Sequence, residues 1–346
     1  MPPLEHPWLP RLEELCRRLR EAVRETLAAA IEASALDDLS RPTSVGAGDW
    51  AFGLDVPTER ELDLWLDEQA RQGPLSLMTE DSGWRHRGPD GAGGVVALDG
   101  FDHGGPRIVV DPIDGTRNLM HDLRPAWTLV SFCEPGPDAP RLADVTVGLI
   151  GELPDSRGGA YRVLTAVRGA GCHITERELQ GDRTRYARRL SVDDSDRADQ
   201  GYFPFFRYAP ILRAPIADLE ATFLARLAEH EAAYTEHCFD DQYCCSAGQL
   251  VLTILGRYRM VVEARPLVAD WLGVSTRPSK PYDVAGAILC AREAGCLVEH
   301  PLGHDLDFEL DTETPVSFVA YHNASTGARL RPHLTAALDA TRPRWK

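Results

Sequence analysis

The sequence contains no long apolar run. In 346 residues, no stretch approaches the roughly 20 consecutive apolar residues that span a bilayer, and the opening segment MPPLEHPWLPRLEELCRRLR has no apolar core of a signal peptide. We therefore expect a cytoplasmic protein without membrane contact.

Positive charge is also scarce. Lys and Arg total 37 against 53 Asp and Glu, which gives a formal net charge of -16. Binding to a nucleic-acid polymer depends on neutralising many phosphates with basic side chains, so such a partner is excluded. A small phosphorylated ligand remains compatible, because one bound cation or a few backbone N–H groups can hold a phosphate whatever the global charge.

Common nucleotide and transition-metal motifs are missing too. The chain has no G-x-x-x-x-G-K-[ST] loop and no H-E-x-x-H pair, and its eight cysteines show no C-x-x-C spacing. We expect small buried thiols rather than disulfides or zinc ligands. A P-loop nucleotide-binding module is disfavoured on the same grounds.

What is present suffices for a large core. Hydrophobic residues make up 43% and charged residues 26%, which is too apolar for disorder and fits one large or two ordinary domains. We expect an N-terminal α+β half over residues 1–185, carrying the acidic motifs. A C-terminal α/β half over residues 186–346 would carry substrate-binding residues and the last acidic motif.

The N-terminal half begins with helical periodicity and then changes to short apolar runs. Apolar spacing predicts helices over 9–33 and 57–71. Runs rich in Val, Ile and Leu predict strands over 75–79, 107–110, 127–133, 145–150 and 161–167, and the glycine-rich residues 88–100 predict a loop or hairpin. The pattern is typical of helices packed on a largely antiparallel sheet.

The C-terminal half follows a polar, proline-bearing segment, 183–209, which we interpret as a connection between the halves. Beyond it, the pattern predicts helices over 216–237, 246–256, 282–294 and 325–340, and strands over 258–263 and 316–321.

The segment RIVVDPIDGTRNLM, residues 107–120, carries the most specific signal. Asp111 and Asp114 are three residues apart at a strand end and can converge on one hard cation, to which the carbonyl of Ile113 can add an oxygen. Gly115 and Thr116 would then open a helix whose free N–H groups can bind phosphate. An isolated Asp-Gly-Thr would be an ordinary turn, but the longer string favours a site.

The string D-P-I-D-G-T-x-N resembles the signature of the inositol monophosphatase family, the magnesium-dependent, lithium-sensitive phosphatases related to fructose-1,6-bisphosphatase. Three further segments agree in order and type. Asp49 and Asp55 resemble the family's paired aspartates, Glu80-Asp81 resembles its acidic pair, and Tyr282-Asp283 leading to Gly295 resembles its W-D-x-A-A-G and E-A-G segments.

The resemblance implies a fold, an assembly and a set of site residues. The fold is of mixed α+β and α/β class, a layered α-β-α-β-α sandwich of the inositol monophosphatase and fructose-1,6-bisphosphatase type, and the assembly is a homodimer. Two or three Mg²⁺ ions are implied, with inhibition by Li⁺. Their ligands fall on Glu80, Asp111, the carbonyl of Ile113, Asp114 and Asp283.

The same resemblance assigns the remaining roles. Thr116 and Glu80 would position the attacking water, and Asp55 would support Thr116 or hold a third ion through water. Substrate contacts are implied at Gly115, Thr116, Ser246, Ala247 and Glu263. Taken singly, Asp283 could be no more than a favourable charge at a helix start, and Ser246 a helix cap.

The chain also departs from the family pattern. Cys245 stands where the family has a glycine, Tyr282 replaces a tryptophan, and the stretches 83–106 and 264–280 are longer than in simple members. The two insertions could form lids, specificity loops or oligomer contacts.

The chemistry of the residues agrees with a phosphatase. Phosphate monoesters hydrolyse very slowly unaided, and oxygen ligands without thiolate or imidazole suit Mg²⁺ rather than zinc. We predict Mg²⁺-dependent hydrolysis of a small phosphate monoester, an inositol phosphate or a sugar phosphate. Alternative substrates are 3'-phosphoadenosine 5'-phosphate and fructose-1,6-bisphosphate; a non-catalytic metal- or ligand-binding homologue is the alternative of another class.

Overall fold

The computed structural model describes residues 4–45, 50–197, 201–235 and 237–345. The chain forms two compact units: unit 1 comprises Met1–Leu190, Lys280–Glu293 and Asp307–Thr314, and unit 2 comprises Ser191–Ser279, Ala294–Leu306 and Pro315–Lys346. The predicted boundary between an N-terminal and a C-terminal half, between residues 185 and 186, remains a prediction. The units are discontinuous in sequence, and the segment that carries Asp283 belongs to unit 1.

Unit 1 is built on a nine-stranded sheet of order β11-β10-β9-β8-β7-β6-β3-β4-β5 within the described residues. Neighbouring strands are antiparallel except β3 and β6, which run parallel from the Ser76–Arg107 pair to the Thr79–Val110 pair. This confirms the expected largely antiparallel sheet. The strands are β3 (Leu75–Thr79), β4 (Gly83–Pro89), β5 (Val95–Ala97), β6 (Arg107–Asp114), β7 (Ala126–Cys133), β8 (Val145–Leu153), β9 (Ala160–Val167), β10 (Gly171–Glu178) and β11 (Thr184–Leu190).

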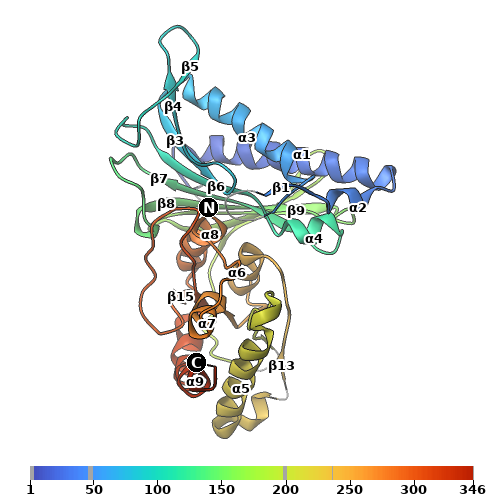
Figure 1. Ribbon diagram of the computed structural model, residues 1–346, viewed down its shortest axis with the longest axis vertical. Coiled ribbons are helices and arrows are strands. Elements are labelled where there is room, and N and C mark those ends of the chain that lie inside the picture. The colour runs from blue at the N-terminus through green and yellow to red at the C-terminus, as the bar shows by residue number, and fades with distance from the viewer. Residues whose placement is uncertain (1–3, 46–49, 198–200, 236, 346) are drawn as a thin grey trace. The chain divides into compact units, whose positions relative to one another are not determined.

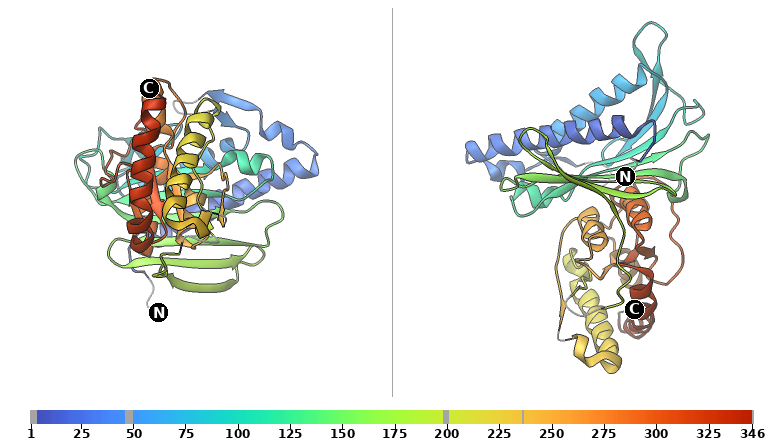
Figure 2. Two further views of the ribbon diagram at one scale, coloured as in Figure 1. Left: turned by 90° about the horizontal axis from the view of Figure 1, so that it is seen from below. Right: turned by 180° about the vertical axis from the view of Figure 1, so that it is seen from behind.

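Helices cover both faces of this sheet (Figure 1). The amphipathic α1 (Leu9–Glu32) and α3 (Asp55–Ala70) bury their apolar sides on one face, and α8 (Pro281–Ala294) lies on the other. Successive residues of strand β8 point to opposite faces of the sheet, so this strand contacts helices on both sides. Gly151 lies against Cys16 of α1, whereas Gly148 lies against Gly286 of α8. The right-hand view of Figure 2 shows α1 and α3 along one side of the sheet. Shorter elements of unit 1 are α2 (Leu36–Leu39), β1 (Pro42–Val45), β2 (Trp50–Phe52), α4 (Thr116–Met120) and η1 (Leu142–Asp144).

Unit 2 contains a three-stranded antiparallel sheet with β16 in its centre. Its core includes Phe205, Phe223 and Tyr321, which are all buried, and the long helices α5 and α9 pack together. Its elements are β12 (Gly201–Tyr202), η2 (Pro210–Leu212), α5 (Arg213–Thr235), β13 (Cys238–Phe239), α6 (Ser246–Ile254), β14 (Met260–Glu263), α7 (Arg265–Leu272), β15 (Leu297–Glu299), β16 (Phe318–Tyr321), α9 (Ala324–Thr341) and η3 (Arg342–Arg344).

The structure confirms the predicted fold class, a mixed α/β protein with a large central sheet flanked by helices, and corrects several local predictions. Residues 184–190, expected to lie in a connection, form the edge strand β11, in which all but Leu190 are exposed, so that no apolar alternation marks it. Strand β6 runs to Asp114 rather than ending at Val110. The hairpin expected over 88–100 is present as β4 and β5, and helix α7 lies inside the second insertion.

Two compositional expectations can be compared with the structure. Six of the eight cysteines are buried, and Cys238 and Cys244 are partly accessible, which agrees with the expected small buried thiols. Among the described residues, no helix has the length and apolarity needed to cross a bilayer.

Candidate active site

Strand β6 places the two motif aspartates in a buried position. Asp111 is 3% exposed and Asp114 is 9% exposed, and the register with β7 shifts between them. The N–H of Ile113 donates to Asp111 Oδ1 at 3.0 Å, and the hydroxyl of Thr128 on β7 donates to the carbonyl of Pro112 at 2.8 Å. These bonds fix the irregular end of β6, where the shift in register redirects the side chains.

The residues after the strand turn sharply into α4. Gly115 has a φ of 96°, a left-handed conformation that strains residues with a Cβ. The hydroxyl of Thr116 lies 2.9 Å from the carbonyl oxygen of Ile113 and 3.4 Å from Asp55 Oδ1. The other oxygen of Asp55 accepts the N–H of Phe52 at 2.7 Å. The structure therefore brings together Thr116 and Asp55, the pair expected to cooperate.

The predicted acidic residues of β6, α8 and the end of β3 interact strongly with one another. Burial raises the pKa of Asp111 well above its usual value, and the charges of Asp283, Asp114 and Glu80 raise it further. Asp111 and Asp283 share a side-chain hydrogen bond. The N–H of Lys280 donates to Asp283 Oδ2 at 2.7 Å, which fixes Asp283 in the first turn of α8. We call Glu80, Asp111, Asp114 and Asp283 the acidic cluster.

Tyr282 makes a contact with the acidic cluster that the sequence did not predict. Its side chain is buried and hydrogen-bonded to Glu80. Burial, followed by the charges of Asp283, Glu80 and Asp111, raises the pKa of the Tyr282 phenol above its usual range. The phenol therefore keeps its proton and donates a hydrogen bond to Glu80. In the sequence, Tyr282 stood out only as a replacement for the family's tryptophan. A polar hydroxyl next to Asp283 was the feature that could have indicated a contact with the acidic residues.

Glu59 of α3 is a second residue near the site that the sequence did not predict. Burial raises the pKa of Glu59 to about 7; Arg85 opposes this shift, and Asp81, Asp63 and Asp55 reinforce it. Glu59 follows Asp55 by four residues on α3, a spacing that puts both on one helix face and could have indicated it.

Ser246, Ala247 and Glu263 lie in unit 2, where two of them share one buried network. Glu263 is 0% exposed, and both of its oxygens accept from Arg265 Nε at 2.9 Å, with Nη2 at 2.6 Å from Oε2. Ser279 Oγ lies 3.2 Å from Arg265 Nη2 and 2.8 Å from Ser246 Oγ. Ala247 is buried in the first turn of α6. The substrate-binding role of Glu263 remains a prediction. Any substrate hydroxyl would have to bind a carboxylate that already accepts hydrogen bonds from Arg265.

The helix that begins with Ser246 is capped by its unusual neighbour. Cys245, at the position of the family's glycine, is the N-cap of α6, and its Sγ accepts the N–H of Gly248 at 3.2 Å. Cys245 therefore satisfies one of the free N–H groups at this helix start.

The donor set of the acidic cluster fits a hard divalent cation. Carboxylate oxygens and the carbonyl of Ile113 are the ligands that Mg²⁺ prefers. The raised pKa of Asp111 indicates more negative charge than the buried setting tolerates, which a cation would relieve. In the part of the chain that the structure describes, no three His, Cys, Asp or Glu side chains already converge into a ready-made metal site. Asp49, the first of the upstream paired aspartates, lies outside the described residues.

Comparison with known proteins agrees with this fold and these motifs. The sequence profile of the inositol monophosphatase family matches residues 90–335, and the chain belongs to this family. Family and fold together define a phosphatase of the superfamily that contains inositol monophosphatases and fructose-1,6-bisphosphatases. No curated protein sequence matches the chain significantly.

Solved structures share the fold at low sequence identity. The extragenic suppressor protein SuhB of Bartonella henselae has a TM-score of 0.60 at 17% identity, covering 94% of this chain and 97% of its own. The inositol monophosphatase of Thermotoga maritima gives 0.59 at 16%, covering 96% and 100%. The fructose-1,6-bisphosphatase of Leishmania major gives 0.63 at 12%, covering 96% of each chain.

Proposed function

We propose that the chain hydrolyses a small phosphate monoester, an inositol phosphate or a sugar phosphate, in a Mg²⁺-dependent reaction at the acidic cluster. The observation that carries this proposal is the buried position of Asp111, whose pKa is raised by burial and by the charges of Asp283, Asp114 and Glu80. Gathering uncompensated carboxylates in a protein interior is costly, and such perturbed clusters are typical of functional sites.

Particular atoms of unit 1 would hold the ions. The carboxylates of Glu80, Asp111, Asp114 and Asp283 and the carbonyl of Ile113 would be the ligands. When bound, Mg²⁺ would offset the charge of the phosphoryl oxygens and lower the pKa of water. Tyr282, which is hydrogen-bonded to Glu80, would keep that carboxylate in a fixed orientation.

Thr116 would orient the attacking water. Its hydroxyl hydrogen is directed to the carbonyl of Ile113 or to Asp55, so its lone pairs remain to accept a hydrogen bond from water. Glu80 would accept the proton that the water loses as it attacks phosphorus. The bond between phosphorus and the ester oxygen breaks in the same displacement, and the substrate alcohol leaves with a proton from solvent. Asp55, fixed by the N–H of Phe52, would support Thr116. Holding water in this orientation removes part of the entropic barrier of the attack.

Substrate contacts complete the proposal. The N–H groups at Gly115 and Thr116 would contact the phosphate, and Ser246, Ala247 and Glu263 would bind the rest of a small polyol. By family analogy, we also propose a homodimer and inhibition by Li⁺.

The test is phosphate release from a panel containing inositol phosphates, sugar phosphates, fructose-1,6-bisphosphate and 3'-phosphoadenosine 5'-phosphate, with Mg²⁺, with EDTA, and with added Li⁺. We expect release that needs Mg²⁺ and prefers one compound. Glu80→Gln should abolish release, whereas Asp99→Asn, which changes an exposed acid, should not. Mg²⁺ binding without release from any compound would contradict hydrolysis and favour a binding protein.

A further inference from the structure

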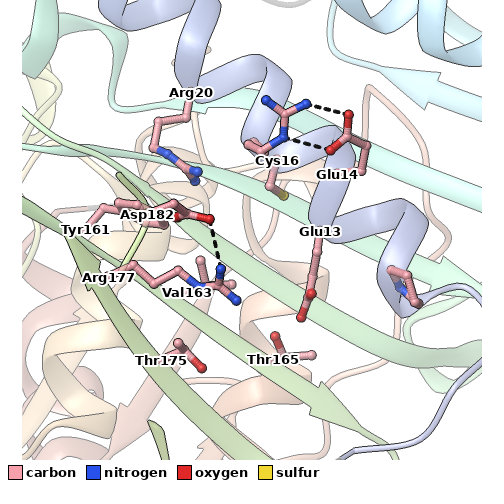
Figure 3. A pocket seen from close by; sticks show the side chains of 12 residues that line it. Glu13, Glu14, Cys16, Arg20, Tyr161, Val163, Thr165, Thr175, Arg177 and Asp182 are labelled. Atoms are coloured by element: carbon pink, nitrogen blue, oxygen red, sulfur yellow. Dashed lines mark hydrogen bonds and ion pairs between the residues drawn. The ribbon is translucent and has the colours of Figure 1, made fainter. Parts of the chain in front are cut away.

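A cavity of about 240 Å³ lies in unit 1 between α1 and the strands β9 and β10 (Figure 3). Residues from the three elements line it, including Glu13, Cys16 and Arg20 of α1, Tyr161 and Thr165 of β9, and Arg177 of β10. None of the residues assigned to phosphate hydrolysis is among its lining residues.

Most charged groups around this cavity already have partners. Arg177 donates to Asp182 at 2.9 Å, and the hydroxyl of Tyr161 also donates to Asp182. Arg17 pairs with Glu14 and with Glu21 at 2.6 Å. Glu13 interacts with the charge of Arg177. The bonds to Asp182 and the ion pairs of Arg17 stabilise the walls without a ligand, whereas Glu13 makes no ion pair with a described residue.

Arg20 differs from these residues. Its side chain reaches from α1 towards Tyr161 and Asp182, and the residue is 6% exposed. No hydrogen bond or ion pair joins it to any described residue; its guanidinium Cζ lies 3.5 Å from the centroid of the Tyr161 ring. Burial lowers the pKa of Arg20, although the charges of Tyr161, Cys16, Asp182 and Glu21 oppose that shift. Its guanidinium N–H groups therefore line a cavity without a protein acceptor.

We propose that this cavity binds a small oxyanion, a metabolite with a phosphate or carboxylate group, through the guanidinium of Arg20. Buried guanidinium N–H groups without a hydrogen-bond acceptor are unfavourable, even with the charge of Asp182 nearby, so an anion that accepts from them would be stabilised. The planar guanidinium can donate two parallel N–H bonds to such a group, and stacking on Tyr161 fixes its plane.

The size and polarity of the cavity limit the rest of the ligand. Its volume is below the roughly 300 Å³ at which pockets for drug-sized molecules begin, so the anion is small. The hydroxyls of Thr165 and Thr175 line the cavity and can bond to polar atoms of the ligand body. Asp182 is engaged by Tyr161 and Arg177, which limits its repulsion of an anion.

The test is calorimetric titration of the full chain with inorganic phosphate and, separately, with L-malate. EDTA is present throughout, so that the acidic cluster keeps its negative charge and repels both probes. We expect one-to-one binding of at least one probe, unchanged in Arg24→Gln, which removes an exposed charge one turn further along α1. Arg20→Gln should weaken binding at least about tenfold. Binding of phosphate alone or of malate alone assigns the anionic group.

Two outcomes would overturn the proposal: no binding of either probe, or equal binding by Arg20→Gln. If Arg20→Gln does not fold, the same titration of Val163→Phe tests the proposal, because the larger side chain fills the cavity from β9 and Arg20 is retained. We then expect binding to disappear. A shift of the Arg20 Nε–H signal in NMR spectra of the unmodified protein, titrated with the same probe, places the ligand at this side chain.

Discussion

Gly148 of β8 and Gly286 of α8 meet backbone to backbone in unit 1. A Cβ on Gly148 would lie 2.3 Å from the carbonyl oxygen of Gly286, and a Cβ on Gly286 would lie 2.4 Å from the carbonyl oxygen of Val130. Real Cβ atoms do not approach backbone this closely, so only glycine permits this packing distance. Because α8 begins two residues before Asp283, the glycine pair also determines how far Asp283 lies from strand β6.

The first prediction concerns this contact. Gly286→Ala should lower the free energy of unfolding by about 1–3 kcal/mol, the usual cost of overpacking, although Ala in a helix is otherwise favoured over Gly by about 1 kcal/mol. Activity should fall as well, because α8 carries Asp283. Urea unfolding measures the first effect, with Gly73→Ala as the control, since a Cβ there meets nothing within 4 Å. A Gly286→Ala protein as stable as the parent would contradict the close contact.

Asp111→Asn should abolish phosphate release while raising stability in the absence of metal. Asn keeps an oxygen that can accept the N–H of Ile113, but it cannot ionise beside the charges of Asp283, Asp114 and Glu80. We expect a loss of about 10³-fold or more in turnover, since a metal ligand supports several kcal/mol of charge stabilisation. The melting temperature in EDTA should rise. Near-normal release by a folded variant would refute the site assignment.

Tyr282→Phe removes only the hydroxyl that is bonded to Glu80. A hydrogen bond to a charged group contributes about 1.5–3 kcal/mol, so we expect kcat to fall at least about tenfold with little change in KM. Tyr186→Phe is a matched control, because that exposed hydroxyl also donates to a glutamate, Glu176, at 3.3 Å. Unchanged kcat in Tyr282→Phe would mean that Glu80 needs no such support.

Glu152 of β8 makes stability depend on pH. Burial raises the pKa of Glu152 from 4.5 to about 7, and its carboxylate accepts the N–H of Arg162 at 2.8 Å, which a Gln oxygen can replace. Because the folded-state pKa is raised, stability is fully present below the unfolded pKa and is lost as pH rises towards 7. Glu152→Gln should therefore gain up to about 3 kcal/mol at pH 8 and nothing near pH 4. A gain independent of pH in urea titrations would contradict this cause.

The buried pair of Glu263 and Arg265 predicts non-additive substitutions in unit 2. Arg265→Met should destabilise by about 3–5 kcal/mol, because it leaves the Glu263 charge uncompensated, and the double variant with Glu263→Gln should recover most of this loss. Glu263→Gln alone should alter substrate preference and KM more than Mg²⁺ affinity. If it changes neither, the predicted substrate role of Glu263 is wrong.

The sequence predicted where helices and strands lie along the chain better than which of them pack together. Asp111 and Asp114 belong to one short string, and Asp283 begins a recognisable helix, so each could be found locally. Their coupling depends on β6 pairing in the sheet and on α8 packing against β7 and β8, which are contacts between distant residues. The family resemblance supplied that step; helical or strand periodicity contains no such information.

Other features depended on side-chain contacts that no pattern encodes. Glu263 was located correctly at the end of β14, but its ion pair with Arg265 follows from how α7 turns back after the strand. Strand β11 was missed because nearly all of its side chains are exposed, which removes the apolar alternation that marks a strand. The unpaired Arg20 could not be found either, since its neighbours come from β9 and β10.

The discontinuity of unit 1 has a consequence for synthesis on the ribosome. A nascent chain that ends at Ser279 already contains strands β3 to β11, but it lacks the helix that covers the Gly148 face of β8. Unit 1 is thus completed only after the first and longest segment of unit 2, Ser191–Ser279, has been translated, and its uncovered apolar surface would have to be protected during that interval. A premature stop before α8 would leave a product with three of the four clustered carboxylates, so an aborted chain would have neither a closed sheet face nor a complete site.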